Sequence, residues 1–317
     1  MISIRWTIAA DCKGVAPNAF WTVASLIDEI AVNTMNPLQT VGISKLAEVT
    51  RGRGEVSIGL IDGAVDLSDS RLKDAHIRNV GGADIICSDP SDAGCRHATL
   101  LAATLFGQLD GACPACTLLV HPIFASTQAS SLPVSDAMTL ASAMVSTVEA
   151  GASVINLSLA VNNVSRQAAL ALNDVLNFAC SRGVIVVAAS GNGGELATSP
   201  VTAHPWVIPV VAYNGGKSLL SFSNIGRSVG RNGLGAPGIV TDSDGAPQIA
   251  GTSVAAVFVT AAAALLRSAL PDSSADEVIH ALRHASGNRR GVIPPLLDAW
   301  TSYLRLKYAC NSLALPL

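Results

Sequence analysis

Charged side chains are scarce in this chain of 317 residues: Asp, Glu, Lys and Arg together make up 14% of it, and the formal net charge is -3. The sequence therefore lacks the basic field that attracts phosphate backbones, and it also lacks an acidic tail. We expect no nucleic-acid partner. Half of the residues are hydrophobic, which is enough for one large core.

A secretory signal and a membrane span are also missing from the first residues. The opening MISIRWTIAADCKG carries one arginine and loses its apolar character by Asp11, so it lacks the apolar run of a signal peptide. The following apolar stretch, 15–32, is interrupted by Asn18, Asp28 and Glu29, which favours a buried helix over a membrane span. We therefore expect a cytoplasmic protein that does not associate with membranes.

The cysteines do not form a recognisable framework. There are seven, an odd number, and no export signal accompanies them, so most are expected to be free thiols. Cys113 and Cys116 form a C-x-x-C without a second pair or a histidine pair at zinc spacing. A local disulfide between these two, or between Cys87 and Cys95, stays open. We predict no metal site and no cofactor.

Short β-branched runs alternate along the chain with alanine-rich helical stretches. Strands that read as continuous apolar runs and are separated by helices indicate a parallel sheet covered on both faces. The pattern predicts an α/β domain over residues 41–317, in which a long helix from about Thr252 to Ala269 ends before Pro271. Residues 1–40 lack the alternation and are predicted to be an N-terminal extension packed on this domain.

Two polar residues stand where catalytic groups are found in α/β proteins, beyond the carboxyl ends of strands. The apolar run 56–61 predicts a buried strand that ends at Asp62 and Gly63. His97 precedes an apolar helical stretch, 98–106, so its imidazole is expected at a helix start. Taken singly, Asp62 is better explained as a turn residue and His97 as a structural histidine.

Ser253 and Asn192 complete the group of candidate catalytic residues. Ser253 lies in Gly-Thr-Ser at the start of the long helix, where the helix dipole and free N–H groups favour an alkoxide, although an N-cap alone has the same signature. Asn192 is bracketed by Gly191 and Gly193 after an apolar run, so its amide can donate to an oxyanion, or it is simply a turn residue.

The four segments, in the order Asp, His, Asn, Ser, together resemble the motifs of the subtilase family of serine proteases. The matching text is IGLIDGAVD around Asp62, CRHATLLA around His97, VVAASGN ending at Asn192 and IAGTSVAA around Ser253. The run 154–160, VINLSLA, resembles the family strand that pairs with the substrate backbone. The resemblance implies a three-layer α/β/α fold with a mostly parallel central sheet.

The resemblance also implies roles for these residues. Asp62, His97 and Ser253 would form the catalytic triad, and Asn192 would bind the oxyanion. A peptide substrate would lie along Ser158, Leu159, Ala160 and Gly191, by adding a strand beside the first three.

Within the family, the chain is most similar to the maturation proteases of cyanobactin and related ribosomal peptide pathways. The looser matches that support this are Gly42–Leu46 leading to Leu60–Asp66, and Leu105–Gln108 leading through Cys116 to Pro122–Phe124. We therefore expect a selective endopeptidase that acts on a leader-bearing precursor peptide.

The chain departs from the family pattern at several positions. Ala98 and Ala160 stand where glycine is usual, and Val257 stands where a proline follows the nucleophile. A methyl group at Ala98 would narrow the approach to the site. These changes favour narrow specificity and leave open a catalytically impaired protein that binds peptides without cutting them. A nucleotide-binding α/β protein is the other alternative, but no glycine-rich phosphate motif follows a strand.

Overall fold

The computed structural model describes residues 4–5, 36–81, 87–107, 111–124, 134–161, 164–215, 217–241, 247–287, 289 and 291–312. The stretch 15–32, which we predict as a buried helix, lies outside these residues, as does most of the predicted extension 1–40. The domain boundary near residue 40 stays a prediction.

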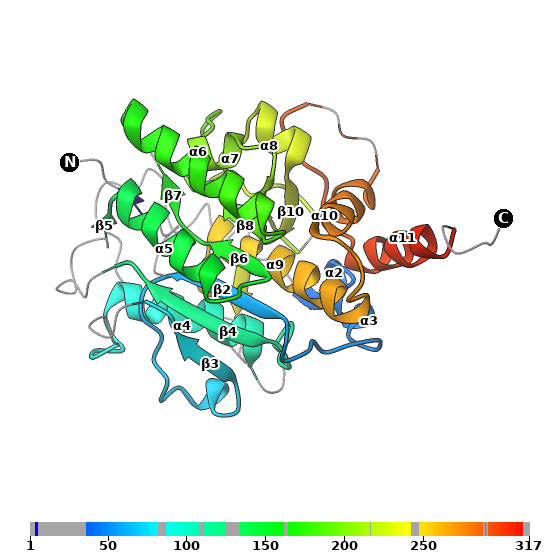
Figure 1. Cartoon of the computed structure of the whole chain (residues 1–317), viewed down its shortest axis with the longest axis horizontal. Coiled ribbons are helices and arrows are strands. Elements are labelled where there is room, and N and C mark those ends of the chain that lie inside the picture. Colours follow the sequence, from blue (N-terminus) through cyan, green and yellow to red (C-terminus); the bar gives the residue numbers. More distant parts are fainter. Residues whose placement is uncertain are drawn as a thin grey trace.

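A seven-stranded parallel sheet occupies the centre of the molecule, as Figure 1 shows. Its order is β10–β9–β8–β6–β2–β4–β3, and each neighbouring pair is parallel. The mostly parallel sheet predicted from the sequence is confirmed. The strands in chain order are β2 (Ser57–Asp62), β3 (His76–Asn79), β4 (Thr117–Pro122), β6 (Val154–Leu157), β8 (Ile185–Ala189), β9 (Val207–Tyr213) and β10 (Leu234–Pro237).

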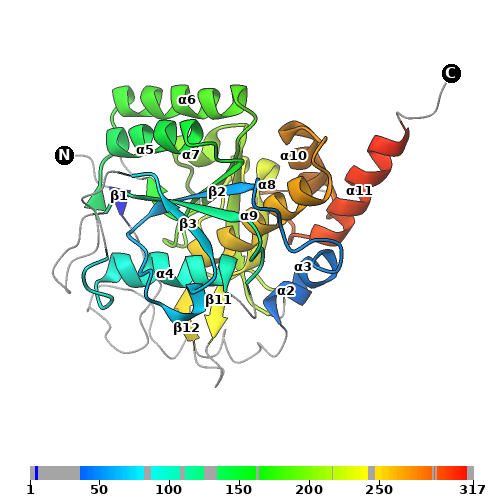
Figure 2. The same ribbon diagram turned by 60° about the horizontal axis from the view of Figure 1, so that its bottom comes forward.

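The strands are apolar along their whole length because both faces of the sheet are covered. In β4, Leu118 and Val120 belong to one hydrophobic cluster, whereas Leu119 between them belongs to the other. The first cluster includes helices α4 (Ala93–Phe106) and α9 (Thr252–Ala269), and the second includes α5 (Ala137–Glu149) and α6 (Arg166–Ser181). Figure 2 shows the two helix layers on either side of the sheet, which confirms the three-layer fold.

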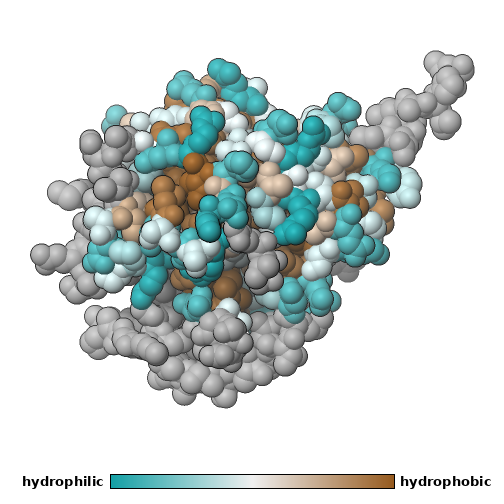
Figure 3. All heavy atoms as spheres, turned by 90° about the horizontal axis from the view of Figure 1, so that it is seen from below, coloured by the Kyte–Doolittle hydropathy of each residue, from teal (hydrophilic) through white to brown (hydrophobic). Residues whose placement is uncertain are grey.

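Shorter helices and turns complete these layers. Helix α10 packs on α9, and α11 packs on both α9 and α3. On the face drawn in Figure 3, hydrophobic residues lie between hydrophilic ones. The elements are α2 (Pro37–Thr40), α3 (Ile43–Leu46), η1 (Ser70–Leu72), α7 (Pro200–Ala203), α8 (Arg227–Asn232), α10 (Ala275–His284) and α11 (Ala299–Ser312).

Helix α9 is the central helix of the core, and its bounds are those predicted from the sequence. Among the described residues it is the one helix long and apolar enough to cross a membrane, yet 89% of that window is buried inside the protein. Its composition therefore reflects burial against the sheet. Val257, which replaces the usual proline, and Phe258 are both buried there.

Two small antiparallel sheets lie outside the central one. Strands β11 (Ile239–Thr241) and β12 (Pro247–Ala250) pair immediately before α9, and β1 (Ile4–Arg5) lies between β5 (Val134–Ser135) and β7 (Ala160–Val161). The run 154–160 is thus divided between two strands. Strand β6 ends at Leu157, and the chain leaves the central sheet at Ser158 to reach β7.

The cysteines follow the prediction in part. Cys113 and Cys116 are free and fully buried, and Cys180 is also free. Cys87 and Cys95 form a disulfide with their Cα atoms 5.6 Å apart, which decides between the local pairings left open by the sequence. This bond closes the short segment that leads into α4.

Candidate active site

Asp62 is the last residue of β2, at the edge of the sheet where the sequence places it. Its Oδ1 atom accepts hydrogen bonds from the Gly63 backbone N–H at 2.7 Å and from His97 Nδ1 at 3.1 Å. Glycine is required at position 63 because a Cβ atom there would collide with the carbonyl of Gly94 in α4. The missing side chain thus lets the first turn of α4 approach the carboxylate.

The Asp62 carboxylate is completely buried. Removal from water raises the pKa of this carboxyl, although His97 and the Gly63 N–H act in the opposite direction by stabilising the charged form. Within the described part of the chain, its second oxygen, Oδ2, has no hydrogen-bond partner. Asp62 is therefore held at a cost in stability, as is common at functional sites.

His97 lies in α4, but the helix starts earlier than the sequence suggested. Asp92 is the N-cap, and its side chain accepts from the N–H groups of Gly94 and Cys95 at 2.9 and 3.1 Å. His97 is therefore in the second turn rather than at the helix start. Its ring is 4% exposed, and Nε2 lies 3.1 Å from Ser253 Oγ.

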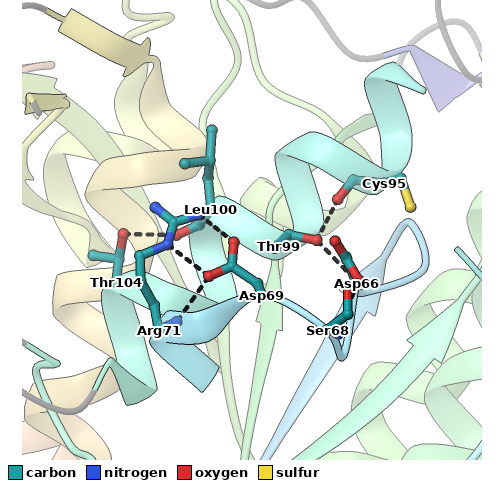
Figure 4. Close-up of polar contacts among 8 residues, drawn as sticks. All are labelled: Asp66, Ser68, Asp69, Arg71, Cys95, Thr99, Leu100 and Thr104. Atoms are coloured by element: carbon teal, nitrogen blue, oxygen red, sulfur yellow. Dashed lines mark hydrogen bonds and ion pairs between the residues drawn. The ribbon is translucent and has the colours of Figure 1, made fainter. Parts of the chain in front are cut away.

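The loop after β2 is hydrogen-bonded to Thr99 of α4, as Figure 4 shows. Thr99 lies two residues beyond His97 in the sequence. The Asp66 N–H donates to Thr99 Oγ1 at 2.8 Å, and this hydroxyl donates in turn to the Cys95 carbonyl at 2.7 Å. Farther along, Arg71 binds Asp69 through Nε and Nη2, which holds the pKa of the Asp69 carboxyl below its usual range. Of these contacts, the bond between Asp66 and Thr99 ties the loop that follows β2 to the helix that carries His97.

Ala98 stands next to His97 in α4. Its side chain is fully buried in the hydrophobic cluster that contains α4 and α9. The narrower approach that we expect from its methyl group stays a prediction.

Ser253 is the second residue of α9, and Gly251 is the N-cap. The serine side chain is buried with 7% exposure, and Gly251 contributes no side-chain cap. A Cβ atom on Gly251 would lie 3.2 Å from Ser253 Oγ and 3.1 Å from Asn192 Nδ2. Both polar groups thus border the space that glycine leaves empty.

Thr252 orients the amide of Asn192, a role that we did not predict. The Thr252 N–H and hydroxyl both donate to Asn192 Oδ1, at 2.9 and 2.8 Å. Because the amide oxygen accepts these two bonds, the amide nitrogen faces the side on which Ser253 lies. The position of Thr252 directly before Ser253 is the sequence signal that could have indicated this role.

Two of the four predicted substrate residues, Ser158 and Gly191, contact the start of α9. The Ser158 hydroxyl donates to the Ser253 backbone carbonyl at 3.1 Å, and Leu159 is buried. The Gly191 N–H donates to Thr252 Oγ1 at 3.2 Å, and Ala160 begins β7. The Ser158 side chain is thus directed at the nucleophile helix, whereas the backbone of β7 pairs with β1.

A buried polar chain behind Ser158 was also missed. Asn156 Nδ2 donates to Ser158 Oγ at 2.6 Å, and Thr260 Oγ1 donates to Asn156 Oδ1 at 2.8 Å. All three side chains are at most 3% exposed. Asn156 within an apolar strand was a visible signal, because a buried amide needs partners.

A carboxylate, an imidazole and a hydroxyl that are hydrogen-bonded in series beyond the ends of parallel strands define a serine hydrolase of the acyl-transfer class. The chain belongs to the subtilase family, whose model, Peptidase S8, matches residues 53–298. It is a subtilisin-like serine endopeptidase. The family resemblance read from the sequence is thereby confirmed.

Individual relatives agree with this membership. Subtilisin DY from Bacillus licheniformis is 30% identical over 252 residues, which cover 74% of this chain and 84% of the relative. The solved structure of the prenylagaramide maturation protease PagA has a TM-score of 0.70 and 25% identity, covering 84% of this chain and 98% of PagA. The patellamide maturation protease PatA has a TM-score of 0.67 and 25% identity, covering 81% and 98%.

Proposed function

We propose that this protein is a processing endopeptidase that cleaves precursor peptides by acyl-enzyme chemistry at Ser253. The observation that carries the proposal is the continuous chain from Ser253 Oγ through His97 to Asp62, with both contacts at 3.1 Å. His97 takes the proton of the Ser253 hydroxyl as it attacks the peptide carbonyl. Asp62 orients the ring and stabilises its charged form.

The developing oxyanion is assigned to the Asn192 amide and the Ser253 backbone N–H. Two hydrogen bonds from Thr252 fix the Asn192 amide before substrate arrives, so that no reorganisation is needed during the reaction. His97 then returns its proton to the leaving amine, and water resolves the acyl-enzyme.

The substrate class is proposed from similarity. PagA and PatA are maturation proteases by name, and this chain spans nearly their whole solved lengths. Strand β7, which follows Ser158, is an outer strand of the sheet β5–β1–β7, and such a strand can recognise an extended peptide by backbone pairing. A leader-bearing peptide of a ribosomal peptide pathway fits this mode.

Mass spectrometry of synthetic precursor peptides encoded near the gene tests the proposal. Wild-type protein is expected to release one defined fragment from such a precursor, while unstructured casein is degraded far more slowly. Ser253→Ala should fold normally and release nothing. Equal cleavage of casein would contradict the selective role, and an active Ser253→Ala variant would contradict the nucleophile.

Labelling by a fluorophosphonate separates the enzyme from a peptide-binding protein without activity. The wild type should be labelled because His97 activates the hydroxyl, whereas Ser253→Ala should not. A folded wild-type protein that resists labelling would favour the catalytically impaired alternative.

A further inference from the structure

The turn that carries Asn192 is hydrogen-bonded to a segment much later in the chain, beyond the end of β9. The Gly194 N–H donates to the Phe222 carbonyl at 2.7 Å, and the Ile225 N–H donates to the Glu195 carbonyl at 2.9 Å. The backbone that follows Asn192 is therefore held against a second part of the protein, in addition to its contact with α9.

Asn224, in this second segment, contacts both sides of Asn192. Its backbone N–H donates to the Gly191 carbonyl at 2.9 Å. Its side-chain oxygen, Oδ1, accepts from the N–H groups of Gly193 and Glu195, at 2.9 and 3.1 Å. Asn224 is only 8% exposed, so water competes little for these bonds. A single residue thus holds the backbone immediately before and immediately after Asn192.

The two glycines beside Asn192 suit this arrangement. Gly191 has a φ of +106°, in the left-handed region that favours glycine. A Cβ atom on Gly193 would lie 3.1 Å from Asn224 Oδ1 and 3.3 Å from the side chain of Glu195. A side chain at position 193 would therefore crowd the atom that accepts its own N–H.

We propose that Asn224 is a positioning residue for the oxyanion and acts through Asn192. Thr252 orients the side-chain amide of Asn192, whereas Asn224 fixes the backbone from which that amide projects. Both are needed, because a donor stabilises the developing charge only at hydrogen-bond distance, and a displacement of about 1 Å can cost about 100-fold in rate. This inference rests on the proposed role of Asn192 in binding the oxyanion.

Asn224→Ala tests the proposal because it removes Oδ1 and keeps the backbone N–H of residue 224. Gly193 and Glu195 are exposed, so the N–H groups that lose their acceptor can bind water instead, and the fold should be retained. The readout is labelling by a fluorophosphonate, whose phosphoryl oxygen stands in for the oxyanion and whose reaction does not depend on a peptide sequence. The labelling rate at saturation and the half-saturating concentration are measured separately.

We expect the saturating rate of the Asn224→Ala protein to fall by about 10- to 100-fold, with the half-saturating concentration and the melting temperature nearly unchanged. Ser223→Ala is the matched control. The Ser223 hydroxyl lies on the same segment but accepts from the Ala212 N–H of β9 at 3.0 Å, so its loss should lower the melting temperature and spare the rate. A wild-type rate in Asn224→Ala, or an equal loss of rate in Ser223→Ala, would overturn the proposal.

A double-mutant cycle shows whether the effect passes through Asn192. In the Asn192→Ala background, Asn224→Ala should slow labelling little further, and independent multiplicative losses would again overturn the proposal. The Asn192→Ala protein also separates this inference from the role on which it rests. If that protein is labelled as fast as the wild type, the proposed oxyanion role is wrong. If it is slow while Asn224→Ala is not, only the positioning role is wrong.

Discussion

The hydroxyl of Ser158 donates a hydrogen bond to the backbone carbonyl of Ser253 across 3.1 Å. This contact links the end of β6 to the first turn of α9, and it is backed by Asn156 and Thr260. The nucleophile is therefore positioned by a buried polar chain on one side, in addition to the triad on the other. Such chains are stable only when every member has its partner.

Thr260→Val should break this chain at the end farthest from Ser253. The substitution leaves Asn156 Oδ1 without its partner in the core, and an unpaired buried acceptor costs about 1 to 3 kcal/mol. We expect a lower melting temperature and a lower kcat with little change in KM. Thr260→Ser keeps the hydroxyl and should restore kcat, whereas equal kcat in all three proteins would show that the chain does not position Ser253.

Asp62→Asn should stabilise the protein while it removes activity. In the folded state burial raises the pKa of the Asp62 carboxyl, so its ionisation is disfavoured relative to the unfolded chain. The contribution of Asp62 to stability is thus fully present below its ordinary pKa of 3.8 and is lost as the pH rises through the raised value. Asparagine does not ionise, so the Asp62→Asn protein does not lose this stability as the pH rises.

Thermal unfolding across the pH range measures this difference. At neutral pH the Asp62→Asn protein should melt a few degrees above the wild type, about 2 to 4 °C for each kcal/mol in a domain of this size. The difference in melting temperature between the two proteins should become smaller as the pH is lowered. A melting temperature below that of the wild type at neutral pH would contradict the assignment, while kcat should fall by about four orders of magnitude, as in other triads.

Thr252→Val should weaken catalysis through Asn192. The variant loses the hydroxyl bond to Asn192 Oδ1 but keeps the bond from the backbone N–H, so we expect kcat to fall by about tenfold with KM nearly unchanged. Loss of the amide itself in Asn192→Ala should cost about 100- to 1,000-fold.

A double-mutant cycle distinguishes orientation from a general structural effect. If Thr252 acts through Asn192, Thr252→Val should have little further effect on kcat in the Asn192→Ala background. Independent, additive losses would refute that link. Thr252→Ser serves as the control that retains the hydroxyl.

The sequence by itself determined the fold class and the catalytic side chains. Apolar runs read as buried strands, and Asp62 falls at the end of β2 because a strand stops where polar residues and glycine begin. The bounds of α9 could also be predicted, because the alanine-rich helical sequence ends near Pro271. The order and the local sequences of the four motifs then identified their polar residues as one catalytic site, although each residue was ambiguous by itself.

The contacts between side chains that are distant in the sequence could be learned only from the folded chain. The early start of α4 depends on the Asp92 cap, and the burial of Ala98 depends on which way that helix faces the core. The pairing of β1 with β5 and β7 joins segments more than a hundred residues apart. Short strands carry almost no sequence signal, because their pairing comes from backbone groups that every residue shares, so the pairing of β1 with β5 and β7 became visible only in three dimensions.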